Sequence, residues 1–162
     1  VSGVDPKLIS RAKKGLYGEI ISDEYMRRKG YAQLLPEGRY ARSLEDVPKG
    51  RGLDGVYENP RHLQPPKYTI TETKYREGGR YIDSDGSASD SALSMTKNSG
   101  KQMSSTWINN HLRNEFKDNP YLRREIEEEG YVSLLMIVDE TGKVVAISKL
   151  NSAGRTIQGI RP

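Results

Sequence analysis

The chain has 162 residues, enough for one domain, with 34% hydrophobic and 30% charged residues. It contains no cysteine, which excludes disulfides, thiolate metal sites and cysteine nucleophiles, and it lacks the run of about 18 apolar residues that would predict a membrane span. Lys and Arg number 26 against 22 Asp and Glu, and the resulting formal charge of +4 suits a polyanionic partner.

The N-terminal half begins with a helical pattern and continues into two strands. Apolar residues recur at three- and four-residue steps from about Pro6 to Tyr31, which predicts a helix that two internal glycines weaken or break. Prolines and glycines in residues 34–51 indicate an irregular connection. A short strand is expected over Leu53–Tyr57, and the alternating KYTITETKY of Lys67–Tyr75 predicts a second strand. Together the two form a hairpin with a long link.

The C-terminal half adds two helices and a second pair of strands. Residues 83–100 are rich in Ser, Asp, Gly and Asn and predict a mobile loop. Helices are expected over Gln102–Phe116 and Tyr121–Glu129. The nearly unbroken apolar run Tyr131–Val138 predicts a buried strand, and after a turn Val144–Leu150 returns as its partner.

This order of elements predicts one α/β domain (α+β mixed) over residues 1–162, with a central mixed β-sheet flanked by helices. We divide it into an N-terminal helical segment (1–31), a core of sheet and helices (52–150) and a basic tail (151–162).

Two carboxylates and a lysine gather on the predicted hairpin. Asp54 stands in the sequence GLDGV, and Glu72 and Lys74 are two residues apart on the next strand, so both face the same side. If the strands pair, Asp54 lies alongside Glu72. Carboxylate oxygens hold Mg²⁺ or Mn²⁺, with Zn²⁺ as the alternative, and such an ion polarises a phosphoryl oxygen and acidifies its water. The lysine positions that water or stabilises charge on phosphorus, which predicts metal-dependent phosphodiester cleavage.

These residues resemble the motif of the PD-(D/E)XK nuclease superfamily. A helix containing GLYGE (residues 15–19) precedes G-x-D-G and a hydrophobic residue, and then hydrophobic-x-E-x-K, which fits Asp54, Glu72 and Lys74 position by position. Leu53 stands before Asp54 where the name of the superfamily has a proline. Within the superfamily, the chain looks like the C-terminal toxin domains of bacterial polymorphic and contact-dependent growth-inhibition systems.

The resemblance implies a restriction-endonuclease-like fold and an endonuclease that cleaves DNA or tRNA. Such domains are delivered from a secreted or cell-surface protein, act in the cytoplasm of a competing cell, and are blocked by a cognate, acidic immunity protein. The resemblance implies that Asp54 and Glu72 are metal ligands and that Glu19 binds the metal directly or through water. It also implies that Lys74 positions the attacking water. The resemblance also implies that a Gln or Lys of the polar stretch KQMSSTW, here Gln102 or Lys101, faces the site.

Each assignment has a plainer alternative. The Asp-Gly pair at 54–55 is also a strong turn signal, and Glu72 and Lys74 suit the solvated face of a strand. Glu19 is equally suited to a solvated helix face, and Gln102 to the start of a helix.

Two further alternatives concern neighbouring residues. Asp23 and Glu24 compete with Glu19 for the role of the helix acid. Trp107 is expected to anchor the core rather than to stack on a base.

Two other functions compete with the metal-dependent nuclease. A metal-independent ribonuclease would use His62 or His111 as general base and acid, although no motif surrounds either residue. A non-catalytic nucleic-acid-binding module would need only a basic rim. Candidates for that rim are Lys13, Lys14, Arg27, Arg28, Lys29, Arg39, Arg42, Lys49, Arg51, Arg61, Lys67 and Arg76, with Tyr40, Tyr57, Tyr75 and Tyr81 as tyrosines that either stack on bases or pack internally.

Overall fold

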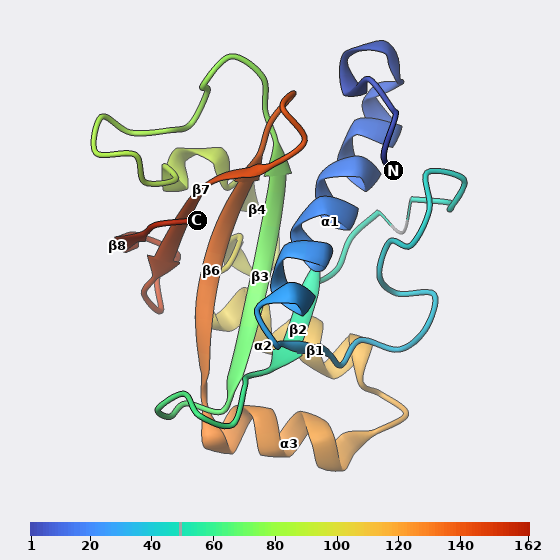
Figure 1. Cartoon of the computed structure of the whole chain (residues 1–162). Coiled ribbons are helices and arrows are strands. Elements are labelled where there is room, and N and C mark those ends of the chain that lie inside the picture. Colours follow the sequence, from blue (N-terminus) through green and yellow to red (C-terminus); the bar gives the residue numbers. More distant parts are fainter. Residues whose placement is uncertain (49) are drawn as a thin grey trace.

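The computed structural model describes residues 1–48 and 50–162. Its central sheet has six strands in the order β1-β2-β3-β6-β7-β8, and helices cover both faces (Figure 1). The predicted mixed α/β fold with a central sheet flanked by helices is therefore confirmed. The elements are η1 (Pro6–Leu8), α1 (Arg11–Arg28), β1 (Ala32–Gln33), β2 (Gly55–Glu58), β3 (Tyr68–Tyr75), η2 (Asp90–Ala92), β4 (Met95–Thr96), β5 (Gly100–Lys101), α2 (Ser105–Glu115), α3 (Pro120–Glu129), β6 (Tyr131–Val138), β7 (Val144–Leu150) and β8 (Thr156–Ile160).

The helix α1 is continuous in spite of its two glycines, although the predicted first turn separates as the 3₁₀ helix η1. Ser10 caps α1, since its hydroxyl accepts the Lys13 N–H at 3.3 Å. Gly18 lies where α1 packs onto β3, and a Cβ at this position would stand 3.2 Å from the Cβ of Tyr75. The residue that weakens the helix in isolation thus lets it approach the sheet closely.

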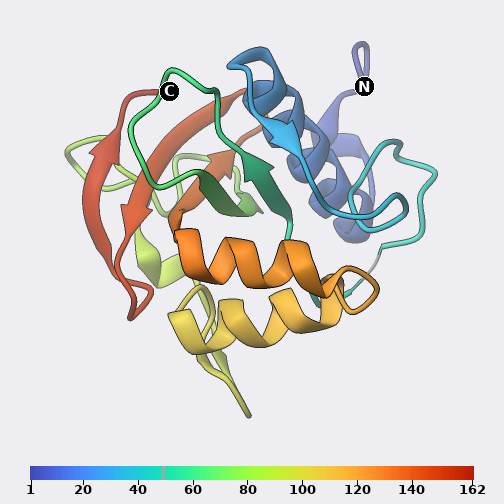
Figure 2. The same ribbon diagram turned by 90° about the horizontal axis from the view of Figure 1, so that it is seen from below.

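Strands β3 and β6 form the parallel centre of an otherwise antiparallel sheet. The chain between them crosses one face through α2 and α3, and Figure 2 shows these two helices side by side on the opposite side of the sheet from α1. In β6, Leu135 and Ile137 pack toward α2, whereas Leu134, Met136 and Val138 pack toward α1. Because both faces are covered, β6 is a nearly unbroken run of apolar residues.

The α2 face holds the larger apolar cluster. Trp107 is 4% exposed and packs there with Leu112 of α2 and Ile126 of α3, so its predicted role as a core anchor is confirmed. No helix in the described ranges is long and apolar enough to cross a membrane.

Two segments differ from their predictions. The loop 83–100 is tied to the sheet, since the carbonyl of buried Ala88 accepts the Ser148 hydroxyl at 2.7 Å. The tail 151–162 contains β8, which pairs with β7. The sequence conceals β8 because it is an edge strand whose residues are mostly exposed, so it has no apolar alternation.

Candidate active site

Glycines on both sides position Asp54 just before β2. Gly52 has φ 143°, and a Cβ there would lie 2.7 Å from a carboxylate oxygen of Glu115. Gly55 opens β2 opposite Thr71, and its added Cβ would overlap the Thr71 hydroxyl. The Asp-Gly pair therefore leads from a bend at Asp54 into a paired strand, which begins two residues later than the predicted Leu53.

Asp54 reaches the strand that carries the other two predicted residues. Its Oδ2 accepts the backbone N–H of Thr73 at 2.9 Å, and Thr73 stands between Glu72 and Lys74. Glu72 and Lys74 share a face, with Lys74 Nζ 3.4 Å from Glu72 Oε2. Because their side chains are only 6% and 18% exposed, the solvated-strand alternative is wrong.

Gln102 joins this cluster from the chain ahead of α2. The helix begins at Ser105, three residues later than predicted, and Gln102 precedes its Ser104 cap. The Gln102 side-chain amide donates to Glu72 Oε2 at 3.0 Å, and its carbonyl accepts the Ser94 N–H at 3.4 Å. Gln102 thus contacts the carboxylate cluster instead of beginning a helix.

The surroundings of Glu72 disfavour the negatively charged form of its side chain. Burial raises the pKa of Glu72 well above its ordinary value, and the negative charge of Asp54 raises it further. Lys74 lowers this pKa, while Glu19 adds a smaller increase. Glu72 Oε1 is buried without a hydrogen-bond partner among the described residues.

A divalent cation fits this pair of carboxylates. It would neutralise two like charges and give the orphaned Glu72 oxygen a partner. Across residues 1–48 and 50–162, no three His, Asp or Glu side chains are grouped so that they could hold a metal ion, so Glu19 does not join Asp54 and Glu72 in one three-carboxylate site. Mg²⁺ is commonly held by only one or two carboxylates, with water and substrate phosphate completing its shell.

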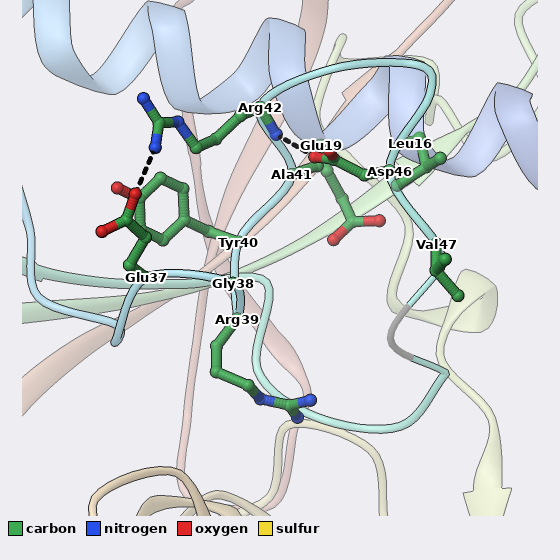
Figure 3. A pocket seen from close by; sticks show the side chains of 10 residues that line it. All are labelled: Leu16, Glu19, Glu37, Gly38, Arg39, Tyr40, Ala41, Arg42, Asp46 and Val47. Atoms are coloured by element: carbon green, nitrogen blue, oxygen red, sulfur yellow. Dashed lines mark hydrogen bonds and ion pairs between the residues drawn. The ribbon is translucent and has the colours of Figure 1, made fainter.

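Glu19 projects from α1 into a pocket of about 370 Å³ beneath the loop 37–47 (Figure 3). Arg39 and Tyr40 line the loop side of this pocket. Of the two competing acids, Asp23 accepts the Tyr57 hydroxyl at 2.7 Å and pairs with Arg27, and Glu24 is exposed. Glu19 is therefore the acid of α1 that faces the pocket, and its charge reaches Glu72.

The two histidines lie elsewhere. His62 is exposed in the link after Glu58, and Glu58 is four residues from Asp54, or roughly 13 Å along an extended strand. The ring of His111 stands 4.2 Å from the ring of Trp107 on α2. Sequence alone left a histidine mechanism open, and the structure places His62 at the far end of the hairpin from the carboxylates.

Much of the predicted basic rim is compensated by ion pairs. The pairs are Lys13–Glu45, Lys14–Glu77, Arg27–Asp23, Arg39–Glu115, Arg42–Glu37 and Lys67–Glu58. Tyr57 and Tyr75 are buried, so the packing alternative is right for these two tyrosines. Lys49 lies outside the described residues.

Sequence reasoning missed two features that hold the site. One is the Thr73 N–H that binds Asp54, since a backbone donor has no signature in the sequence. The other is Glu115, whose fully buried carboxylate pairs with Arg39 at 2.6 Å and fixes the pocket loop against Gly52. The sequence does not reveal this contact because Arg39 and Glu115 are 76 residues apart.

Two carboxylates, an ammonium group and an amide therefore converge, and the charge of Glu19 reaches them from a pocket that none of these four side chains lines. No protein-family model, curated protein or solved structure matches this chain. Its function is consequently inferred from the chemistry of these side chains.

Proposed function

We propose that this chain is a divalent-metal-dependent endonuclease that hydrolyses phosphodiester bonds of DNA or RNA, tRNA included. The observation that carries the proposal is the convergence of Asp54, Glu72 and Lys74 at one end of the β2–β3 hairpin. Paired carboxylates with an adjacent ammonium suit phosphoryl chemistry, because they combine a cation site with a group that handles water or phosphate.

The residues divide the work among them. Asp54 and Glu72 would hold the ion, with Glu19 acting through water, and the ion would supply Lewis acidity and an acidified water. The Lys74 ammonium would orient the attacking water or stabilise negative charge on the phosphoryl oxygens. Gln102 would keep the Glu72 carboxylate in one orientation through its 3.0 Å hydrogen bond. The Thr73 N–H does the same for Asp54.

The resemblance to polymorphic toxin domains extends the proposal to its biological setting. The domain would act in the cytoplasm of a competing bacterium, and an acidic immunity protein would protect the producing cell. Co-purification with the product of the adjacent downstream reading frame tests this setting. A product that neither binds nor inhibits the domain would count against the toxin role.

Lys74→Met is expected to lower cleavage by about 10²–10⁴-fold, the usual contribution of a group that handles a proton in the transition state. Divalent ion should still raise the melting temperature of this variant, because the carboxylates remain. The assay compares plasmid DNA and total tRNA as substrates, with Mg²⁺, Mn²⁺, Zn²⁺ or EDTA. Lys117→Met, which changes an exposed lysine beyond α2, is the matched control and should cleave like wild type.

Each other outcome of this assay points to a different function. Cleavage that persists in EDTA would favour a metal-independent ribonuclease that uses His62 or His111. Salt-sensitive binding without cleavage under any ion would favour the non-catalytic module. Full activity of Lys74→Met would remove Lys74 from the site.

A further inference from the structure

Two arginines and a tyrosine lie just beyond the carboxylate cluster, at the end of β3. We call Arg76, Arg80 and Tyr81 the arginine–tyrosine cluster. Arg76 follows the last residue of β3, and its N–H still donates to the carbonyl of Val138 at 2.9 Å. The alternation of the strand therefore extends to Arg76, which places it on the face of Lys74 and about 7 Å further along.

A glycine turn brings the second arginine to the same tyrosine ring as the first. Gly78 and Gly79 both have positive φ, 68° and 75°, and the Gly78 N–H donates to the Glu140 carboxylate at 3.2 Å. The guanidinium carbons of Arg76 and Arg80 then lie 5.4 Å and 5.3 Å from the centre of the Tyr81 ring. This turn follows the upper end of β3 in Figure 1.

Tyr81 is held in a conformation that a non-glycine residue seldom adopts. Its φ is 63°, while its carbonyl accepts the Ser89 N–H at 2.8 Å and its ring packs against the α2-side core. Local backbone strain of this kind persists only where the surroundings enforce it, and it concentrates at ligand-binding positions. The result is a fixed ring that orients both guanidinium groups.

In the part of the chain that the structure describes, no carboxylate neutralises the two arginines of the cluster by an ion pair. Among the described residues, neither Arg76 nor Arg80 forms an ion pair with a carboxylate, in contrast to the paired cations of the basic rim. The nearby Glu77 binds Lys14 and the Tyr75 hydroxyl. Two permanently charged guanidinium groups thus lie against the Tyr81 ring without a carboxylate partner, and that of Arg76 also donates to the carbonyl of Tyr75 at 2.7 Å.

We propose that the arginine–tyrosine cluster binds backbone phosphates of the substrate strand next to the scissile bond and sets the register of cleavage. This inference rests on the proposed nuclease function, for which it supplies the strand-positioning site. Arginine binds phosphate through two parallel N–H donors, and phosphate contacts fix register without reading sequence. Because Arg76 is one strand repeat from Lys74, a phosphate bound there neighbours the reacting one.

The test measures binding of a fluorescent oligonucleotide, as DNA and as RNA, over a range of salt concentrations. It uses the full chain carrying Glu72→Gln, in EDTA, so that cleavage does not interfere. Adding Arg76→Gln and Arg80→Gln should reduce the slope of log affinity against log salt by about 1.4–1.8, the loss of two phosphate contacts. The control pair Arg124→Gln and Arg161→Gln removes an Arg–Tyr contact on α3 and a C-terminal charge, and should leave the slope unchanged.

The inference and the nuclease proposal fail separately. If the wild type cleaves with metal but the Arg76/Arg80 variant keeps the full slope, the cluster is not a phosphate site and the nuclease proposal stands. If the slope falls as expected but the wild type cleaves nothing, phosphate binding by the cluster is supported and the nuclease proposal is overturned. Arg76→Lys with Arg80→Lys should restore the slope of log affinity against log salt, because lysine keeps the positive charge. The same change should broaden the range of cleavage products of the active enzyme, because lysine lacks the two parallel N–H donors of arginine.

Discussion

Replacing Glu72 with glutamine should abolish metal-dependent cleavage and, at the same time, raise the melting temperature of the metal-free domain. The loss of activity should reach at least about 10²–10³-fold, the effect of removing a single group that stabilises charge in a transition state. Glutamine keeps the shape of the side chain and its contact with Gln102, so misfolding would not explain the loss. A variant that is inactive and more stable would mark Glu72 as functional.

The gain in stability follows from the raised pKa of Glu72. A folded-state pKa above the ordinary value means that the folded protein binds the proton more tightly than the unfolded chain does. Binding of this proton therefore stabilises the folded wild type. This contribution is fully present below the ordinary glutamate pKa of 4.5 and is lost as the pH rises through the raised pKa of the folded state. Glutamine does not titrate, so the difference in melting temperature between variant and wild type should widen with pH.

Thermal melting from pH 4 to pH 8 in EDTA tests this expectation. For a domain of this size, each kcal/mol shifts the melting temperature by about 2–4 °C. Added Mg²⁺ or Mn²⁺ should stabilise the wild type and not Glu72→Gln, because only the wild type keeps both carboxylates. Glu128→Gln changes an exposed helix acid and serves as the control. A folded Glu72→Gln variant with wild-type cleavage would exclude Glu72 from the site.

Gly55→Ala should lower the free energy of unfolding by about 1–3 kcal/mol, the usual cost of an overpacked interior. The added Cβ would overlap the Thr71 hydroxyl and the ring of Tyr57. Neither neighbour has space to retreat, since both are buried and the Tyr57 hydroxyl is bonded to Asp23 at 2.7 Å. Relief of the overlap would shift the start of β2 and displace Asp54, so cleavage should fall as well.

Gly15→Ala is the matched control. This glycine lies within α1, and a Cβ there would meet nothing within 4 Å. Alanine is expected to stabilise the helix by about 0.5–1 kcal/mol without altering activity. Urea denaturation of both variants measures the two effects. Equal stability of Gly55→Ala and the wild type would show that β2 tolerates a side chain at this position.

Local patterns in the sequence were sufficient for the main elements. The apolar run of β6 and its partner β7 have the predicted bounds, because burial on both faces of a strand favours a nearly continuous run of hydrophobic residues. The common face of Glu72 and Lys74 follows from the two-residue period of a strand, which any extended chain obeys. The edge strand β8 escaped prediction because little of it is buried.

The tertiary structure alone decided how distant segments meet at the site. The contacts of Asp54 with the Thr73 N–H, of Gln102 with Glu72 and of Arg39 with Glu115 join residues 19, 30 and 76 positions apart. Periodicity describes only which side of one element a residue occupies, whereas these contacts depend on the register of the hairpin and the crossover that carries α2 over the sheet. The burial that raises the pKa of Glu72 has the same origin, because other segments of the chain exclude water from it.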